Sequence, residues 1–86
     1  MERIRNIHPG EILKEEFLEP LDLTQYLLAK ETGLSHSTIT NIVNGKQPIT
    51  PDVALRISRF LGTSSEFWLG LQNDYDVYEL SACNAI

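Results

Sequence analysis

Residues 36–46 are rich in polar side chains, most of them short, of types that can hydrogen-bond to the edges of nucleic-acid bases. The set consists of His36, Ser37, Thr38, Thr40, Asn41, Asn44 and Lys46. A helix that is merely solvated usually carries Glu, Lys and Arg, whereas no acidic residue lies between Thr32 and Pro51. Asn can pair with adenine, and Thr methyl groups can contact the methyl group of thymine. We therefore predict that Asn41 reads a base and that Lys46 is the main cationic phosphate contact.

A pair of short helices joined by a tight turn would position these side chains. Residues 24–45 have the sequence pattern of such a pair. Thr24 can cap the first helix, and Gly33 can end it, because a sharp turn needs a residue that tolerates positive φ. Ser35 can cap the second helix, which would enter a major groove. Gln25 would hydrogen-bond a phosphate from the start of the first helix. The alternative is a plain packing unit that binds nothing.

Three further segments have apolar residues at helical spacing, and no segment alternates with period two over the length of a strand. Their predicted limits are His8 to Pro20, Thr50 to Gly62, and a last helix that begins at a capping box, Thr63–Glu66, with Ser64 as the alternative cap. The sequence therefore predicts an all-α fold of five helices, with the helix-turn-helix at helices 2 and 3. We expect a single domain over 1–86, with an N-terminal arm at 1–7 and a frayed tail at 81–86.

Apolar spacing also predicts which side chains form the core. The predicted core residues are Ile12 or Leu13, Phe17, Leu18, Leu27, Leu28, Ala29, Ile39, Ile42 or Val43, Val53, Ala54, Ile57, Phe60 and Leu61. In the last helix, Phe67 and Leu71 are predicted to close this core. Trp68, Tyr75 and Tyr78 either cap it as well or form a dimer contact, since interfaces favour aromatic residues. A two-fold dimer would place two recognition helices roughly 34 Å apart on a palindromic operator.

The net charge of −5 disfavours non-specific attraction to phosphate, but the charges are unevenly distributed. Residues 35–62 contain three bases and one acid, whereas residues 1–34 contain seven acids and four bases, and residues 63–86 contain four acids and no base. The predicted recognition surface is thus the segment least repulsive to DNA. One copy should still bind modestly, so that a dimer or a partner would help.

Several classes of protein are disfavoured. The chain has neither an apolar run of about 18 residues nor a leader, so we expect a cytoplasmic protein with no membrane segment. The single Cys83 cannot form an internal disulfide, in agreement with a reducing compartment. His8, His36 and Cys83 lack the paired spacing of metal ligands, and no nucleophile elbow, phosphate loop or carboxylate pair stands out. We therefore expect no metal, no cofactor and no enzymatic activity.

Several motifs resemble known proteins. The pattern of Gln25, Ala29, Gly33, Ile39 and Ile42 resembles the helix-turn-helix of the lambda-repressor-like (XRE/Cro) family. The segments HPGEILKEEFLEPL at 8–21, STITNIVNGKQPITPDVALRISRFLGTS at 37–64 and EFWLGLQNDYD at 66–76 are similar to HigA-type (VapI-like) antitoxins of bacterial toxin–antitoxin modules. The likeness extends over nearly all of residues 7–78, and the ordered set of motifs is specific.

The resemblance implies a usually dimeric bacterial protein that neutralises a small RelE-fold mRNA endonuclease, HigB, and represses the operon they share. It also implies the DNA-facing positions, which are Gln25, His36, Ser37, Thr38, Thr40, Asn41 and Lys46. The acidic first and last helices would suit a basic, ribosome-targeting partner. The leading prediction is therefore an antitoxin that doubles as an autorepressor. The alternatives are a transcription regulator without a toxin, and a protein-interaction module that has lost DNA binding.

Overall fold

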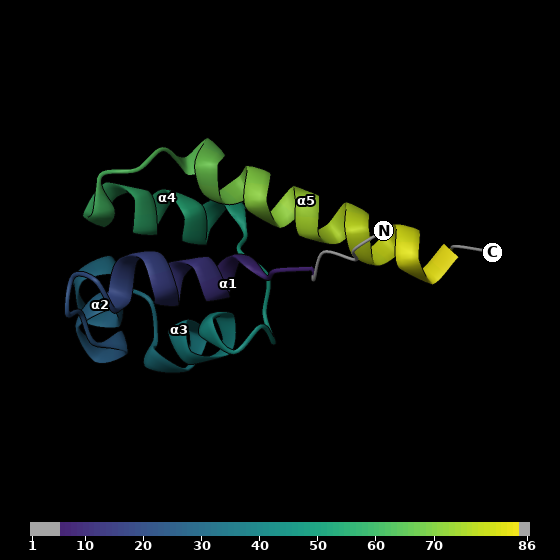
Figure 1. The fold of residues 1–86 in the computed structure, drawn as a ribbon. Helices are drawn as coiled ribbons and strands as arrows, with labels where there is room; N and C mark the ends of the chain where they lie inside the picture. Colours follow the sequence, from purple (N-terminus) through teal and green to yellow (C-terminus); the bar gives the residue numbers. More distant parts are fainter. Residues whose placement is uncertain (1–5, 85–86) are drawn as a thin grey trace.

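The computed structural model describes residues 6–84, with side chains as far as residue 81, and these residues form an all-helical fold (Figure 1). The elements are α1 (Pro9–Ile12), the π-helix η1 (Leu13–Leu18), α2 (Gln25–Thr32), α3 (His36–Val43), α4 (Pro51–Leu61) and α5 (Ser65–Asn84). Because η1 continues α1 without a break, the described residues contain five helices and no strand. The predicted fold class is confirmed.

The helices are arranged around α1. In Figure 1, α4 and α5 lie on one side of α1, and α2 and α3 lie on the other. The second half of α5 extends beyond the rest, and the molecule measures 44 × 23 × 23 Å. α5 continues to Asn84, through residues 81–84 of the tail that was predicted to be frayed. Residues 1–5 of the predicted arm and residues 85–86 lie outside the described part.

The limits of the helices follow the predicted capping residues. Thr24, Ser35 and Thr50 each accept the backbone N–H three residues further on, at 3.0, 3.1 and 3.4 Å. Gly33 and Gly62 end α2 and α4 in the left-handed region, both at φ 78°, where a side chain would be strained. The positions of α2, α3 and α4 in the chain are therefore set by local hydrogen bonds.

The beginning of α5 differs from the favoured prediction. Ser64 is the cap, since its Oγ accepts the N–H of Phe67 at 3.1 Å. The Thr63 hydroxyl instead accepts a hydrogen bond from Nε1 of Trp68 at 2.7 Å. Trp68 is fully buried in the core, whereas Phe67 is 41% exposed. The assignment of Trp68 to a dimer interface is therefore wrong, and so is the burial of Phe67.

The core lies between the layers of helices. Its buried members are Leu13, Leu18, Leu28, Ala29, Ile39, Ile42, Ile49, Val53, Ala54, Ile57 and Trp68. Two predicted members, Leu27 and Phe60, are each 36% exposed because they lie on the outer sides of α2 and α4. Phe17, Val43, Leu61 and Leu71 pack against the core while remaining partly exposed.

One glycine sets the distance between α1 and α3. A Cβ at Gly10 would overlap the carbonyl group of Ile42 and lie 3.1 Å from Cα of Val43. The backbones of the two helices thus approach more closely than any residue with a side chain would allow. This contact holds the C-terminal end of α3 against α1.

Candidate nucleic-acid interface

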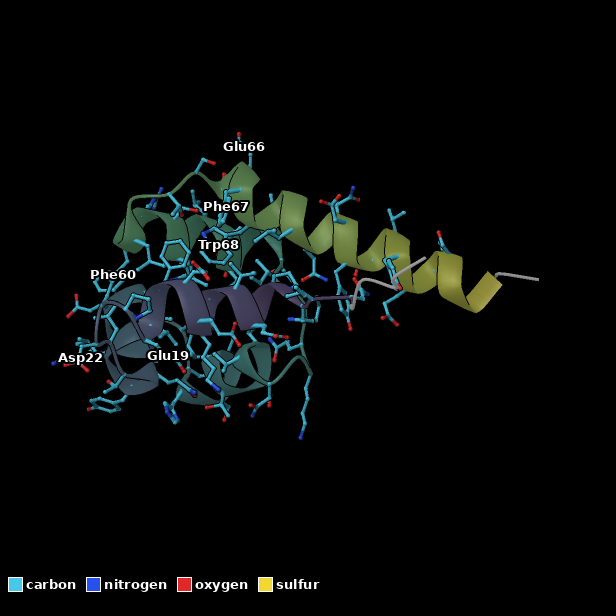
Figure 2. All side chains as sticks on the ribbon, viewed as in Figure 1. Glu19, Asp22, Phe60, Glu66, Phe67 and Trp68 are labelled. Carbon is cyan, nitrogen blue, oxygen red and sulfur yellow. The ribbon has the colours of Figure 1, made fainter. Side chains whose placement is uncertain are left out.

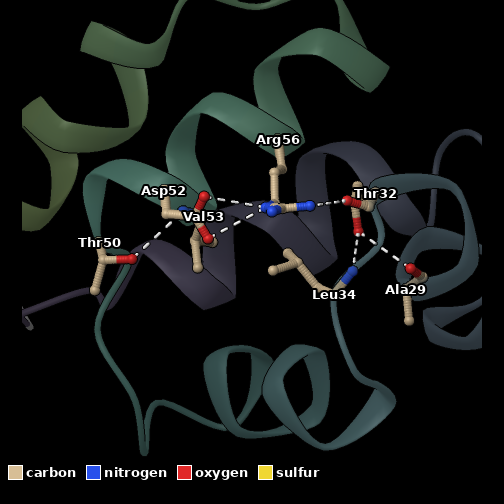
Figure 3. Close-up of polar contacts among 7 residues, drawn as sticks. All are labelled: Ala29, Thr32, Leu34, Thr50, Asp52, Val53 and Arg56. Carbon is tan, nitrogen blue, oxygen red and sulfur yellow. Dashed lines mark hydrogen bonds and ion pairs between the residues drawn. The ribbon is translucent and has the colours of Figure 1, made fainter.

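The turn between α2 and α3 is fastened to α4 by a polar network (Figure 3). Arg56 on α4 donates from Nη1 to the carbonyl oxygen of Thr32 at 3.1 Å, and its Nε donates to the carboxylate of Asp52 at 3.1 and 3.2 Å. The buried Thr32 hydroxyl accepts the N–H of Leu34 at 3.4 Å, directly after the turn. The network gives the carbonyl group of Thr32, at the C-terminal end of α2, a partner from α4.

Helix α3 presents the predicted polar residues on its outer face. Ile39 and Ile42 are fully buried beneath it. The exposed members of the set are His36, Ser37, Asn44 and Lys46, and the half-buried members are Thr38, Thr40 and Asn41. All seven therefore lie on α3 or in the turn that follows it. A short helix with a polar outer face of this kind can enter the major groove of DNA and contact the edges of the bases.

Gln25 is joined directly to the recognition helix. The Thr40 hydroxyl donates to Oε1 of Gln25 at 2.9 Å, across the junction between α2 and α3. Because this bond engages the amide oxygen, the amide nitrogen is the group of Gln25 that can donate to a phosphate. Tyr26, the next residue in the first turn of α2, is 69% exposed. Tyr26 was not predicted from the sequence, although it directly follows Gln25 in the chain.

The turn after α3 positions Asn41 and Lys46. Gly45 has φ 74°, and the N–H of Lys46 donates to the carbonyl oxygen of Asn41 at 2.8 Å. Nδ2 of Asn41 donates to Oε1 of Gln47 at 3.4 Å, which limits the orientations of the Asn41 amide. Gln47 was not predicted from the sequence either, because it lies six residues from Asn41, the side chain that it orients.

The same turn is supported from behind by His8 and α5. Nδ1 of His8 accepts the N–H of Gly10 at 2.9 Å, and its ring packs edge-on against Tyr75, with 4.8 Å between the ring centroids. Burial lowers the pKa of His8, although Asp76 and the backbone of Gln47 act in the opposite direction. The neutral imidazole is therefore the form that fits this junction.

The remaining candidate residues are dispersed. Tyr75 and Tyr78 are half-buried on α5, while the apolar residues most exposed in its second half are Val77 (54%) and Leu80 (65%). His36 is exposed on α3, so it lies apart from the buried His8, and the side chain of Cys83 is outside the described part. None of the described helices is long and apolar enough to cross a membrane.

Comparisons with known proteins agree with this arrangement. The helix-turn-helix family HTH_3 matches residues 14–68. Virulence-associated protein I of Dichelobacter nodosus is 46% identical over 71 residues, which are 83% of this chain and 66% of that protein. Antitoxin HigA-1 of Vibrio cholerae is 39% identical over 75 residues, which are 87% of this chain and 70% of that protein. The chain thus spans about two thirds of the length of these curated relatives.

A solved structure extends the likeness to three dimensions. The Pseudomonas aeruginosa antitoxin HigA, determined with the higBA promoter, superimposes with a TM-score of 0.91 at 40% identity, over 93% of this chain and 87% of that chain. Both the helix-turn-helix and the long last helix are included in so wide a match. The chain therefore belongs to the XRE-type helix-turn-helix family and, within it, to the HigA-type, VapI-like group.

Proposed function

We propose that this chain is the antitoxin of a bacterial toxin–antitoxin module, and that it also represses its own operon by sequence-specific DNA binding. The observation that carries the proposal is the match to a HigA antitoxin solved with its promoter, at 40% identity over 93% of this chain. The acid-free polar face of α3 supports it independently, because that face has groups for base contacts and no carboxylate to repel phosphate.

In the DNA-bound state, α3 lies in the major groove. Asn41 pairs with an adenine, and the methyl groups of Thr38 and Thr40 contact thymine. Gln25 and Lys46 hold phosphates, together with the free N–H groups at the start of α2. His36, Ser37 and Asn44 are the remaining contacts, at the two ends of α3.

A dimer supplies the affinity that one copy lacks. The outer side of the second half of α5 is apolar at Val77 and Leu80, with Tyr75 and Tyr78 beside them, and this part of the helix extends away from the core (Figure 1). Two chains that pair there read the two halves of a palindrome. Each half-site then adds its own few phosphate contacts to a single binding event.

The second partner is a HigB-like, RelE-fold mRNA endonuclease. A protein that works on ribosome-bound RNA carries basic surface, and this chain offers acidic residues on its first and last helices. Both partners act in the cytoplasm.

The proposal is tested at the gene. A small basic reading frame beside this one should stop growth when expressed alone, and co-expression of this chain should restore it. Failure to rescue or to co-purify would contradict the antitoxin role. Footprinting of the upstream region separates the other two functions: protection without a toxin indicates a stand-alone regulator, and partner binding without protection indicates an interaction module.

A further inference from the structure

The end of the molecule where η1 leads into α2 and α4 leads into α5 carries exposed apolar and acidic side chains. Figure 2 shows Glu19 and Asp22 on one side of this end, Glu66 and Phe67 on the other, and Phe60 between them. Its apolar members are Leu21, Phe60 and Phe67, which are 57%, 36% and 41% exposed. Its acidic members are Glu19, Asp22 and Glu66, all exposed. We name these six residues the aromatic end. They come from three separate parts of the chain, which are the turn after η1, the end of α4 and the start of α5.

The aromatic end is built on a rigid base. The ring of Phe17 lies 6.3 Å from that of Phe67 and 5.2 Å from that of the buried Trp68, and the rings of Phe67 and Trp68 are 4.9 Å apart. Because Phe67 is held on this stack, it loses little conformational freedom when another surface covers it. An exposed aromatic side chain that is already ordered is typical of the energetic centre of an interface.

The turn between η1 and α2 is fixed as well. The N–H of Leu21 donates to the carbonyl oxygen of Phe17 at 3.1 Å, and the N–H of Asp22 donates to that of Glu19 at 3.2 Å. Asp22 has φ 56°, a conformation that Asp tolerates better than most residues. Leu21 lies in this turn, where the two hydrogen bonds hold its backbone. Arg59, which lines the groove next to Phe60, is a base at the margin of the patch.

A glycine keeps the neighbouring surface open. Gly70 lies one turn after Glu66 and Phe67, and at helical spacing its position falls between theirs on the exposed face of α5. A Cβ there would have nothing within 4 Å, and φ is not positive, so neither packing nor backbone conformation requires glycine within this chain. A residue that weakens the helix without any such need leaves room for a backbone approaching from outside.

We propose that the aromatic end is the docking surface for the toxin, an inference that rests on the function proposed above. An endonuclease that acts on ribosome-bound RNA needs a basic surface to hold a polyanion. The three carboxylates complement such a surface, and Phe67, which its aromatic neighbours hold in place, provides an exposed apolar contact. Glu66 and Phe67 are on α5, and α1 lies between α5 and α3 (Figure 1), so they can be altered without touching the recognition helix.

The test measures the affinity of the full chain for the small basic protein encoded beside its gene, produced in a catalytically inactive form. Phe67→Ala should weaken binding about 30-fold or more, as loss of a central aromatic contact does. Glu66→Lys should weaken it about tenfold, with a smaller dependence on salt. Asp74→Lys is the matched control, because it makes the same charge change on the exposed face of the same helix and should have little effect. Circular dichroism verifies that each variant is folded.

The outcomes separate the two proposals. If the unaltered chain does not bind the basic protein, the proposed antitoxin function fails, and the docking surface fails with it. If it binds, and Phe67→Ala and Glu66→Lys bind as tightly as Asp74→Lys, the function stands and the docking surface is wrong. If Phe67→Ala converts a dimer to a monomer in sedimentation, the patch belongs to a second copy of the chain and the inference is overturned.

Discussion

Replacing Gly10 with Ala should destabilise the fold and disturb the DNA-binding face together. The new methyl group would overlap the carbonyl group of Ile42, which belongs to the backbone of α3 and cannot swing aside as a flexible side chain would. This overlap is relieved only if α1 and α3 move apart. The part of α3 that moves is the end that leads into Asn44 and Lys46. Gly10→Ala should therefore weaken DNA binding as well as destabilise the fold.

The magnitude follows from two opposing effects. Overpacking a well-packed contact costs about 1–3 kcal/mol, and a clash with backbone belongs at the upper end of that range. Ala also stabilises a helix by about 0.5–1 kcal/mol relative to Gly. The expected net loss is about 2 kcal/mol, or a decrease in Tm of roughly 10 °C for a domain of this size.

Gly70→Ala provides the matched control. It makes the same chemical change in a helix, but at a position with nothing within 4 Å of the new methyl group. It should therefore gain about 0.5–1 kcal/mol and raise Tm by a few degrees. Thermal and urea unfolding measure both effects, and an operator shift assay with folded Gly10→Ala protein measures the effect on the site. Equal Tm changes for the two variants would refute the close contact between α1 and α3.

Three further results are expected. Asn41→Ala should weaken binding to the operator by about 1–3 kcal/mol and relax the base preference. Lys46→Ala should weaken binding to DNA of any sequence to a similar extent and reduce the salt dependence of binding. Unchanged affinity of both variants in salt-controlled shift assays would contradict the assignment of α3 to the major groove. Because burial lowers the pKa of His8, the unfolded chain takes up its proton first, so the free energy of unfolding should fall as pH decreases below about 6.5; urea titrations should show this slope diminished in His8→Gln. Thr63→Val should cost about 1–3 kcal/mol in urea unfolding because Nε1 of Trp68 loses its partner, and a loss comparable to that of an exposed substitution would count against this bond.

The helix-turn-helix could be predicted because its signals are local. Each capping hydroxyl accepts an N–H three residues away, so Thr24, Ser35 and Thr50 carry information that does not depend on the rest of the fold. Gly33 ends α2 because of its own positive φ angle, which is likewise a local property. The polar face of α3 was predictable as well, since Ile39 and Ile42 fix which side is buried.

Contacts between helices were not predictable in the same way. Phe67 and Trp68 are both aromatic and adjacent, so spacing alone does not show which of them enters the core. That choice depends on the rotation of α5 against η1 and on Thr63, whose hydroxyl can satisfy the indole N–H of Trp68. The bond between Gln25 and Thr40 spans 15 residues and is formed only after α2 and α3 have packed. The orientation of the Gln25 amide is therefore a tertiary property.

A separation of charge across the fold would let a chain with a net charge of −5 bind both partners proposed above, the operator DNA and a basic protein. The short dimensions of the molecule are 23 Å, and α1 lies between α3 and the first half of α5, the half that contains Glu66 (Figure 1). The Debye length at physiological ionic strength is about 8 Å, so a phosphate at α3 is largely screened from Glu66 or Asp74. A basic partner at the aromatic end meets Glu66 directly. Neutralising Glu66 should therefore weaken toxin affinity and leave operator affinity almost unchanged, except at low salt, where the screening is lost.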